Sequence, residues 1–413
     1  MSGIKCIIKE KELFLIVYIL LLMFQQLLEK KLFFFSYLDE LPAFLAIVFY
    51  MLSNRCFKIN KKSINMVIAL GIFVFSGLLG NILYRYQPIK YVIIDLLTNL
   101  KFILAVYFSM KFFPNGVKSY KKLPCFLSII SILLFILFLA DRLFGIYGGE
   151  IRHGIHASQL FFGHPNYLAG FCGFLIACLS IFGVKRHRFP IILDLIMLVF
   201  TLRAKALANA AVYLCLFYFI YVRYSKVKFY HYVLMGCLSV FFAWSQIAFY
   251  HITHLENSAR SVMLMTSFII LYDYFPIGTG FGTYASHSAA ANYSPVYYKY
   301  GFSDYYELRN SPVGTFFDDQ FWPIILGQTG FIGFIAYASY LLILMGKINK
   351  LASINREAYF SSLFVFLYLM ISTMADPGFN NTIAVPLALA LGFAFNIPKY
   401  ENNLEVNQLE TFS

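Results

Sequence analysis

Residues 123–141 read LPCFLSIISILLFILFLAD, an apolar run that reaches its first charged side chain only at Asp141. An α-helix rises about 1.5 Å per residue, so about 20 apolar residues span the hydrocarbon core of a bilayer. The chain is 60% hydrophobic and 13% charged, about half the charged fraction of soluble domains. These features predict an all-α polytopic membrane protein. Nine further runs have a comparable length, near residues 13–28, 32–52, 64–84, 91–110, 166–184, 229–249, 321–346, 357–375 and 382–397.

One more apolar region, residues 189–222, is interrupted by Arg203 and Lys205. We expect two short helices that meet at these charges, which brings the prediction to about twelve transmembrane helices. The run at 13–28 follows a basic start, but no small-residue cleavage site follows it, so we expect a retained helix. Residues 1–413 are therefore expected to form a single integral membrane domain. No internal repeat is evident in the sequence, which disfavours an inverted-repeat transporter.

Lysine and arginine residues recur in alternate connections between the predicted spans. Because such residues favour the cytoplasmic side, we expect both termini there, with residues 398–413 as a polar, mobile tail. The same rule places the long connection at 250–320, between spans nine and ten, on the outer face. The net charge of +13 thus reflects topology and does not indicate nucleic acid binding. The seven cysteines show no zinc-site spacing, and we expect no metal and no cofactor.

Three cations near the outer face are the first candidates for function. Arg203 and Lys205 lie in TLRAKAL, within an otherwise apolar region, where insertion of each charge costs about 2.5–3.5 kcal/mol. Arg260 precedes an apolar run in the outer loop. A guanidinium binds phosphate oxygens bidentately and a nearby ammonium adds a point charge, so the expected ligand is anionic. The alternative is that these side chains extend to the membrane interface without binding anything.

Aromatic side chains crowd the outer loop. Flat apolar faces with polar edges suit a sugar-binding platform, and Tyr284, Tyr297 and Tyr298 are candidate substrate-binding residues. An interfacial aromatic belt is the alternative. The whole set is Tyr284, Tyr293, Tyr297, Tyr298, Tyr300, Tyr305 and Tyr306.

Acidic residues and a histidine in the same loop are candidates for proton transfer. Asp318 and Asp319 lie in TFFDDQFWPIILGQTGFIGF, where the loop returns to the membrane. Adjacent carboxylates repel each other, which raises the pKa of one and suits a general base. The alternative is a cap for the helix that begins near Phe321. His287 is a weaker base candidate.

Two short motifs contain the remaining candidate functional residues. The glycines at 278, 280 and 282 would allow close backbone packing or would offer N–H groups to an anion. FFGHPNYLAGF, residues 161–171, contains His164 and Asn166 as candidate substrate contacts. For this second motif a turn followed by a helix start is a simpler interpretation than catalysis.

Together these motifs resemble the O-antigen and capsular polysaccharide polymerase family, the Wzy type, within the O-antigen ligase-like superfamily. The resemblance covers about residues 140–340 and rests on four segments. Aromatic-rich versions of this pattern look more like capsule or exopolysaccharide polymerases than ligases. The four segments are GHPNYLAG, TLRAKAL, ARSVMLMTSFIILYDYFPIGTGFGTY with YSPVYYKYGF after it, and DDQFWPIILGQTGFIGF.

The resemblance implies a type C glycosyltransferase-like fold with an active site at the outer face of the cytoplasmic membrane. The implied substrate is an oligosaccharide repeat unit on undecaprenyl diphosphate, and the implied partners include flippase and chain-length regulator proteins. Two arginines of the family are expected to hold the diphosphate, and the matching positions are Arg203 and Arg260, with Lys205 beside them. Ligases use a loop histidine as base. This chain departs from that pattern with Asp318 and Asp319.

Three other functions stay open from the sequence. A related ligase would pass the glycan to a different acceptor. A flippase for lipid-linked oligosaccharides would distribute charges over both leaflets, whereas here they gather on the outer side. A membrane anchor for a partner protein would not require such a loop.

Overall fold

A computed structural model describes residues 2–52, 61–114, 119–152, 154–254, 258–310 and 316–411. These residues form helices and one short antiparallel hairpin. The helices before the hairpin are α1 (Ser2–Glu29), η1 (Phe33–Glu40), α2 (Leu41–Leu52), α3 (Lys61–Tyr84), α4 (Ile89–Phe112) and α5 (Leu123–Phe144). The hairpin and the helices up to the outer loop are β1 (Ile151–Arg152), β2 (Ile155–His156), η3 (Leu160–Phe162), α6 (Pro165–Ile181), α7 (Arg188–Phe200), α8 (Ala204–Phe217), η4 (Tyr218–Val222), α9 (Phe229–Ala248) and η5 (Phe249–Thr253). The remaining helices are α10 (Ala259–Asp273), α11 (His287–Ala291), α12 (Pro295–Lys299), η6 (Phe302–Asp304), α13 (Phe321–Leu351), α14 (Arg356–Ser372) and α15 (Ala384–Thr411).

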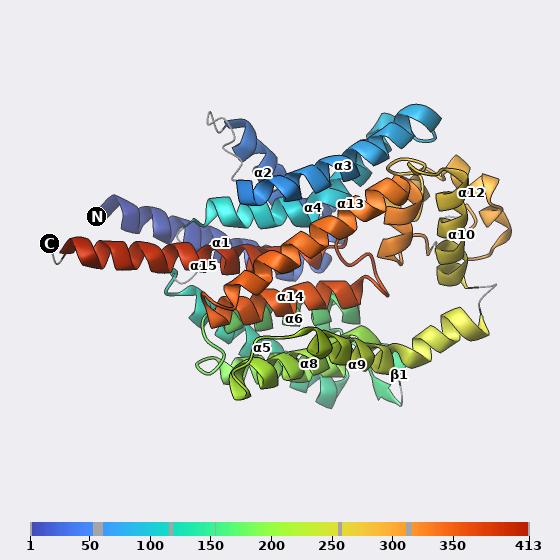
Figure 1. Ribbon diagram of the computed structural model, residues 1–413. Helices are drawn as coiled ribbons and strands as arrows, with labels where there is room; N and C mark the ends of the chain where they lie inside the picture. Colours follow the sequence, from blue (N-terminus) through green and yellow to red (C-terminus); the bar gives the residue numbers. More distant parts are fainter. Residues whose placement is uncertain are drawn as a thin grey trace.

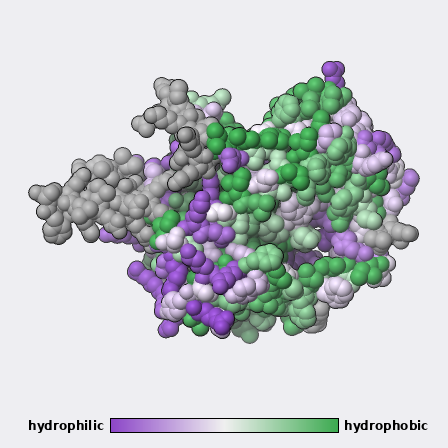
Figure 2. Space-filling view, in the orientation of Figure 1, coloured by the Kyte–Doolittle hydropathy of each residue, from purple (hydrophilic) through white to green (hydrophobic). Residues whose placement is uncertain are grey.

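The architecture is that of an all-α polytopic membrane protein, as predicted. Within the described ranges, eight helices are long and apolar enough to cross a bilayer, and two shorter apolar segments lie at Pro165–Ile181 and Ala384–Ile397. Figure 2 shows a broad hydrophobic belt on the visible face, with most hydrophilic atoms toward its two ends. A belt of this kind is expected where lipid replaces water as the solvent.

The long helices run roughly side by side, and the loop helices cover one end of the bundle (Figure 1). α13 packs against α3, α15 against α4, and α14 against α6 and α8. Both termini lie at the end opposite α10 and α12, and α10 stands across the direction of the long helices (Figure 1). The long loop, which the sequence predicted to lie on the outer face, therefore covers one end of the bundle.

The break between α7 and α8 occurs where the sequence predicted it. α7 ends at Phe200, Leu202 has a left-handed φ of 53°, and Arg203 is the extended N-cap of α8. The prediction of two short helices that meet at Arg203 and Lys205 is thus confirmed. Residues 398–411, the greater part of the predicted tail, continue α15 as a helix, and 412–413 lie outside the described residues.

Polar side chains inside the bundle find partners on other elements. Lys101 of α4 forms a buried ion pair with Asp39 of η1, with an Nζ–Oδ2 distance of 2.6 Å. Asp95 accepts a hydrogen bond of 3.0 Å from Asn99 and is also bonded by Gly282 and Gln328. Asp95 and Lys101, both on α4, therefore have different partners, and Asp95 connects α4 to the long loop and α13.

The glycine run serves close backbone packing. The backbone N–H of Gly280 donates to the carbonyl of Gln328 at 2.8 Å, beside the non-helical Gly330 in α13. A Cβ at Gly278 would lie 2.5 Å from the backbone nitrogen of Gly330. Asn81 of α3 bonds both backbone groups of Phe281, at 2.8 and 2.9 Å. The loop is thereby joined to two long helices.

We expect Gly280→Ala to destabilise the protein. Gly280 has a φ of 100°, and a Cβ there would lie 2.5 Å from Asn81 Nδ2 and 2.6 Å from its backbone nitrogen. Strain of about 1–3 kcal/mol is typical of a side chain forced into such a conformation. The midpoint of thermal unfolding in detergent should fall. Gly71→Ala is the matched control, since a Cβ there meets nothing within 4 Å, and an equal fall in both variants would contradict the packing role.

Candidate anion-binding site

Three cations from two distant segments share one site. The start of α8 carries Arg203 as its N-cap and Lys205 as its second residue, and the first turn of α10 carries Arg260. The positive charge of Arg260 acts on both Arg203 and Lys205. Burial is the main cause of a lowered pKa of Arg203, and the charges of Arg152 and Arg260 add to it. Lys205 and Arg260 also line one cleft, and the three cations lie within electrostatic range of one another.

Helix N-termini add to this positive potential. His164 is the N-cap of α6, Arg203 is the N-cap of α8, and Arg260 is the second residue of α10. The N-terminus of a helix carries a partial positive charge, so an arginine there is disfavoured by about 0.3–1 kcal/mol, and an anion is favoured. Cations in these positions are typical of a site that receives a negatively charged ligand.

Each cation is balanced by a carboxylate from a separate segment. Arg203 Nη2 lies 3.2 Å from Glu150 Oε1, and Lys205 forms an ion pair with Asp376. Arg260 donates to Asp319 Oδ2 through Nε at 3.2 Å and Nη2 at 3.1 Å. Glu150 and Asp376 were missed, because no sequence spacing links them to the cations.

His164 and Asn166 join this network. His164 Nε2 lies 3.0 Å from Arg203 Nη2, and its Nδ1 accepts from the backbone N–H of Asn166 at 3.2 Å. The Asn166 side chain donates to Asp376 Oδ1 at 3.4 Å. The motif at residues 161–171 therefore starts a helix, as expected, and also places two side chains at the cations.

An apolar cleft of about 520 Å³ opens from the cations. Its polar end contains Lys205 and Arg260, and its length is lined by apolar side chains from α8, α9 and α14. A cleft that is charged at one end and apolar along its length fits an amphiphile with an anionic head. The apolar lining includes Ala208, Val212, Met235, Val240, Leu367, Met370 and Ile371.

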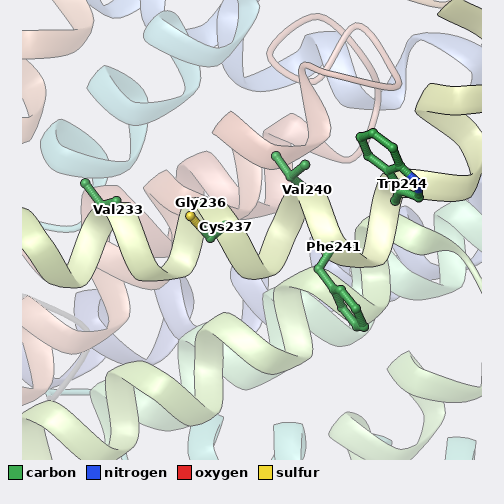
Figure 3. A pocket seen from close by; sticks show the side chains of 6 residues that line it. All are labelled: Val233, Gly236, Cys237, Val240, Phe241 and Trp244. Carbon is green, nitrogen blue, oxygen red and sulfur yellow. The ribbon is translucent and has the colours of Figure 1, made fainter. Parts of the chain in front are cut away.

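A second hollow of about 610 Å³ follows an exposed face of α9. Its lining residues recur at helical spacing, so they form one stripe along the helix. Figure 3 shows Val240 and Trp244 on one side of α9 and Phe241 on the other. Gly236 and Val240 line both this hollow and the cleft, so the two apolar hollows adjoin along α9.

Asp318 and Asp319 have different surroundings. Asp319 is bound to Arg260, whereas Asp318 Oδ2 lies 4.0 Å from His287 Nδ1. Partial burial is the main cause of a raised pKa of Asp318, whose side chain stays 48% exposed; the charge of His287 opposes the shift and that of Asp319 adds to it. The alternative role as a helix cap does not hold, because Gln320 is the N-cap of α13. Asp318, which has a raised pKa and is not the carboxylate paired with Arg260, is thus the better candidate for a proton acceptor.

The predicted tyrosine platform needs correction. Tyr284 and Tyr297 are fully buried in the core of the outer loop. The Tyr284 hydroxyl donates to the carbonyl of Met263 at 2.6 Å, and Tyr297 Oη accepts from the backbone N–H of Ala285 at 2.9 Å. These two rings shape the loop and offer no free face. Tyr298 is 57% exposed and stays available to a ligand.

Comparison of the chain with models of known protein families found no match, and a comparison with curated proteins found none either.

Proposed function

We propose that this protein polymerises undecaprenyl-diphosphate-linked oligosaccharide repeat units at the outer face of the cytoplasmic membrane. The product would be a capsular polysaccharide, an exopolysaccharide or an O-antigen. The proposal includes twelve spans, formed by α1 to α9 and α13 to α15, both termini in the cytoplasm, and a fold of the type C glycosyltransferase kind. α10 to α12 then belong to the outer loop that covers the site.

One observation carries the proposal, namely the apolar cleft that begins at Lys205 and Arg260. A polyprenyl diphosphate has the matching shape, with a long apolar chain and a compact anionic head. Arg203, Lys205 and Arg260 would hold the diphosphate, and the polyprenyl chain would lie along α9. Fixed cations stabilise the charge that develops on a departing diphosphate, so this chemistry needs no nucleotide.

The reaction would be a direct displacement. A hydroxyl oxygen of the incoming unit attacks the anomeric carbon of the growing glycan, and the bond from that carbon to the diphosphate oxygen breaks. Asp318 takes the hydroxyl proton, and undecaprenyl diphosphate leaves with the negative charge beside the cations. This geometry inverts the configuration at the anomeric carbon. Asp319 holds Arg260 in place, and Tyr298 is a candidate sugar contact.

Purified protein in detergent, supplied with a synthetic undecaprenyl diphosphate repeat unit, tests the proposal. We expect a ladder of glycan lengths on a gel without added nucleotide. Transfer of glycan to a different acceptor without a ladder would indicate a ligase. Unchanged substrate, together with movement of the same lipid between liposome leaflets, would indicate a flippase. Either of the last two results would overturn polymerisation.

We expect Glu150→Gln to strengthen diphosphate binding. Glu150 competes with the ligand for Arg203, and its side chain is 56% exposed, so the pair is worth about 0–1 kcal/mol. Loss of this charge should lower the dissociation constant of undecaprenyl diphosphate about two- to fivefold. Asp304→Asn is the control, since Asp304 is an outer-loop acid bonded to Ser303. Weaker binding in Glu150→Gln would show that Glu150 supports the ligand instead.

A further inference from the structure

The contact between His164 and Arg203 contains an unresolved hydrogen-bond conflict. A neutral imidazole carries one N–H group, and a guanidinium has donors only. The backbone N–H of Asn166 points to His164 Nδ1 at 3.2 Å, and Arg203 Nη2 lies 3.0 Å from Nε2. If Nδ1 accepts from Asn166, the ring proton sits on Nε2 and two donors face each other. If instead Nε2 accepts from Arg203, the ring proton sits on Nδ1 and faces the backbone N–H of Asn166.

The two nitrogens of the His164 ring differ in whether an additional hydrogen-bond acceptor could be placed beside them. The Nδ1 end is occupied by the first turn of α6, where the N-cap bond satisfies a backbone donor. The Nε2 end faces the charged cluster. There Arg203 Nε is a second buried donor without an acceptor among the described residues. One oxyanion placed at this end would accept from both Nε2–H and the guanidinium.

We propose that His164 is a neutral hydrogen-bond donor which, together with Arg203, binds one phosphoryl group of the diphosphate substrate. This inference rests on the proposed function and assigns a specific role within the site. Lys205 and Arg260, at the mouth of the apolar cleft, are then left for the second phosphoryl group. Arg203 and Lys205 at the start of α8 would thus serve different phosphoryl groups, and Arg260 of α10 would join Lys205 at the second.

The electrostatic surroundings keep His164 neutral in the free protein. Burial is the main cause that lowers the pKa of His164 to about 4, and Arg203, Lys205 and Arg152 act in the same direction, whereas Glu150 opposes them. Between about pH 5 and 8 the ring therefore supplies a donor without adding a fourth positive charge. A neutral donor beside an arginine retains the hydrogen bond and avoids repulsion between two cations.

Two substitutions separate binding from helix capping. His164→Asn keeps a side-chain acceptor for the backbone N–H of Asn166 but cannot reach the position of Nε2. His164→Gln reaches farther, and its amide can donate there. The probe is geranylgeranyl diphosphate, with geranylgeraniol as the headless control, and binding is measured by calorimetry in detergent. A hydrogen bond to a charged group is commonly strong enough that its loss weakens binding about tenfold or more.

We expect His164→Asn to lose at least tenfold in affinity for the diphosphate, His164→Gln to lose less, and both to bind geranylgeraniol like the wild type. Wild-type affinity in His164→Asn, or equal losses in both variants, would overturn the role of His164. The proposed function would still stand in that case if the wild-type protein binds the diphosphate and forms glycan. A wild type that binds neither probe would count against the proposed function itself.

Discussion

Arg260→Ala should reduce glycan polymerisation about 10²–10³-fold, the loss typical when one preorganised group that stabilises a developing negative charge is removed. Arg260 lies at the mouth of the apolar cleft and acts electrostatically on Arg203 and Lys205. Its guanidinium also lies 4.7 Å from the centre of the Tyr250 ring, which restricts its movement. The substitution leaves Asp319 without its cation, so the site would lose positive charge and gain an uncompensated carboxylate. The length of glycan formed from the synthetic repeat unit is the readout.

Two controls make this result specific. Arg309→Ala removes another arginine of the outer loop, an exposed one that lies 4.6 Å from the Tyr306 ring and does not line the cleft. We expect polymerisation within about twofold of the wild type for that variant, since exposed charges contribute little. Arg260→Lys keeps the charge but loses the two-donor contact with Asp319, so an intermediate rate is expected. Equal activity of Arg260→Ala and Arg309→Ala would remove Arg260 from the mechanism.

Much of the fold follows from hydropathy, because backbone groups inside a bilayer must form their hydrogen bonds within the protein. Apolar runs such as residues 123–141 must be helical to satisfy their backbone groups, and α5 covers that run. The break at Arg203 was also predictable, since charges interrupt an apolar region there. The continuation of α15 past residue 398 was not predictable from polarity, because polar residues are compatible with both helix and coil.

The site was only partly predictable, and its residues show why. Arg203 and Arg260 stand out as cations in apolar surroundings, a signal that the sequence carries by itself. The pairing of Lys205 with Asp376 depends on how α8 and the connection before α15 meet, and no sequence spacing encodes that. Likewise, Tyr297 and Tyr298 are neighbours of the same type. Only the folded loop decides that one is buried and the other exposed.

Asp318→Asn should reduce polymerisation about 10²–10⁴-fold, the range that general base catalysis commonly supplies. Of the two adjacent acids, Asp319 is occupied by Arg260, and Asp318 has a carboxyl whose pKa is raised mainly by burial. A base must be ionised to accept a proton. The wild-type rate should therefore fall as the pH drops through this raised pKa, at a higher pH than for an ordinary aspartate near 3.9.

Asp319→Asn supplies the comparison that decides between the two acids. If Asp319 positions Arg260, this variant should chiefly weaken binding of the diphosphate lipid. The fall of its reaction rate at low pH should occur at the same pH as in the wild type. Asp318→Asn should instead bind the lipid normally and lose turnover, because an amide of similar shape cannot take the proton. A rate measured from pH 4 to 8 at saturating substrate separates these effects. Loss of turnover with unchanged binding in Asp319→Asn, and wild-type turnover in Asp318→Asn, would assign the base to Asp319.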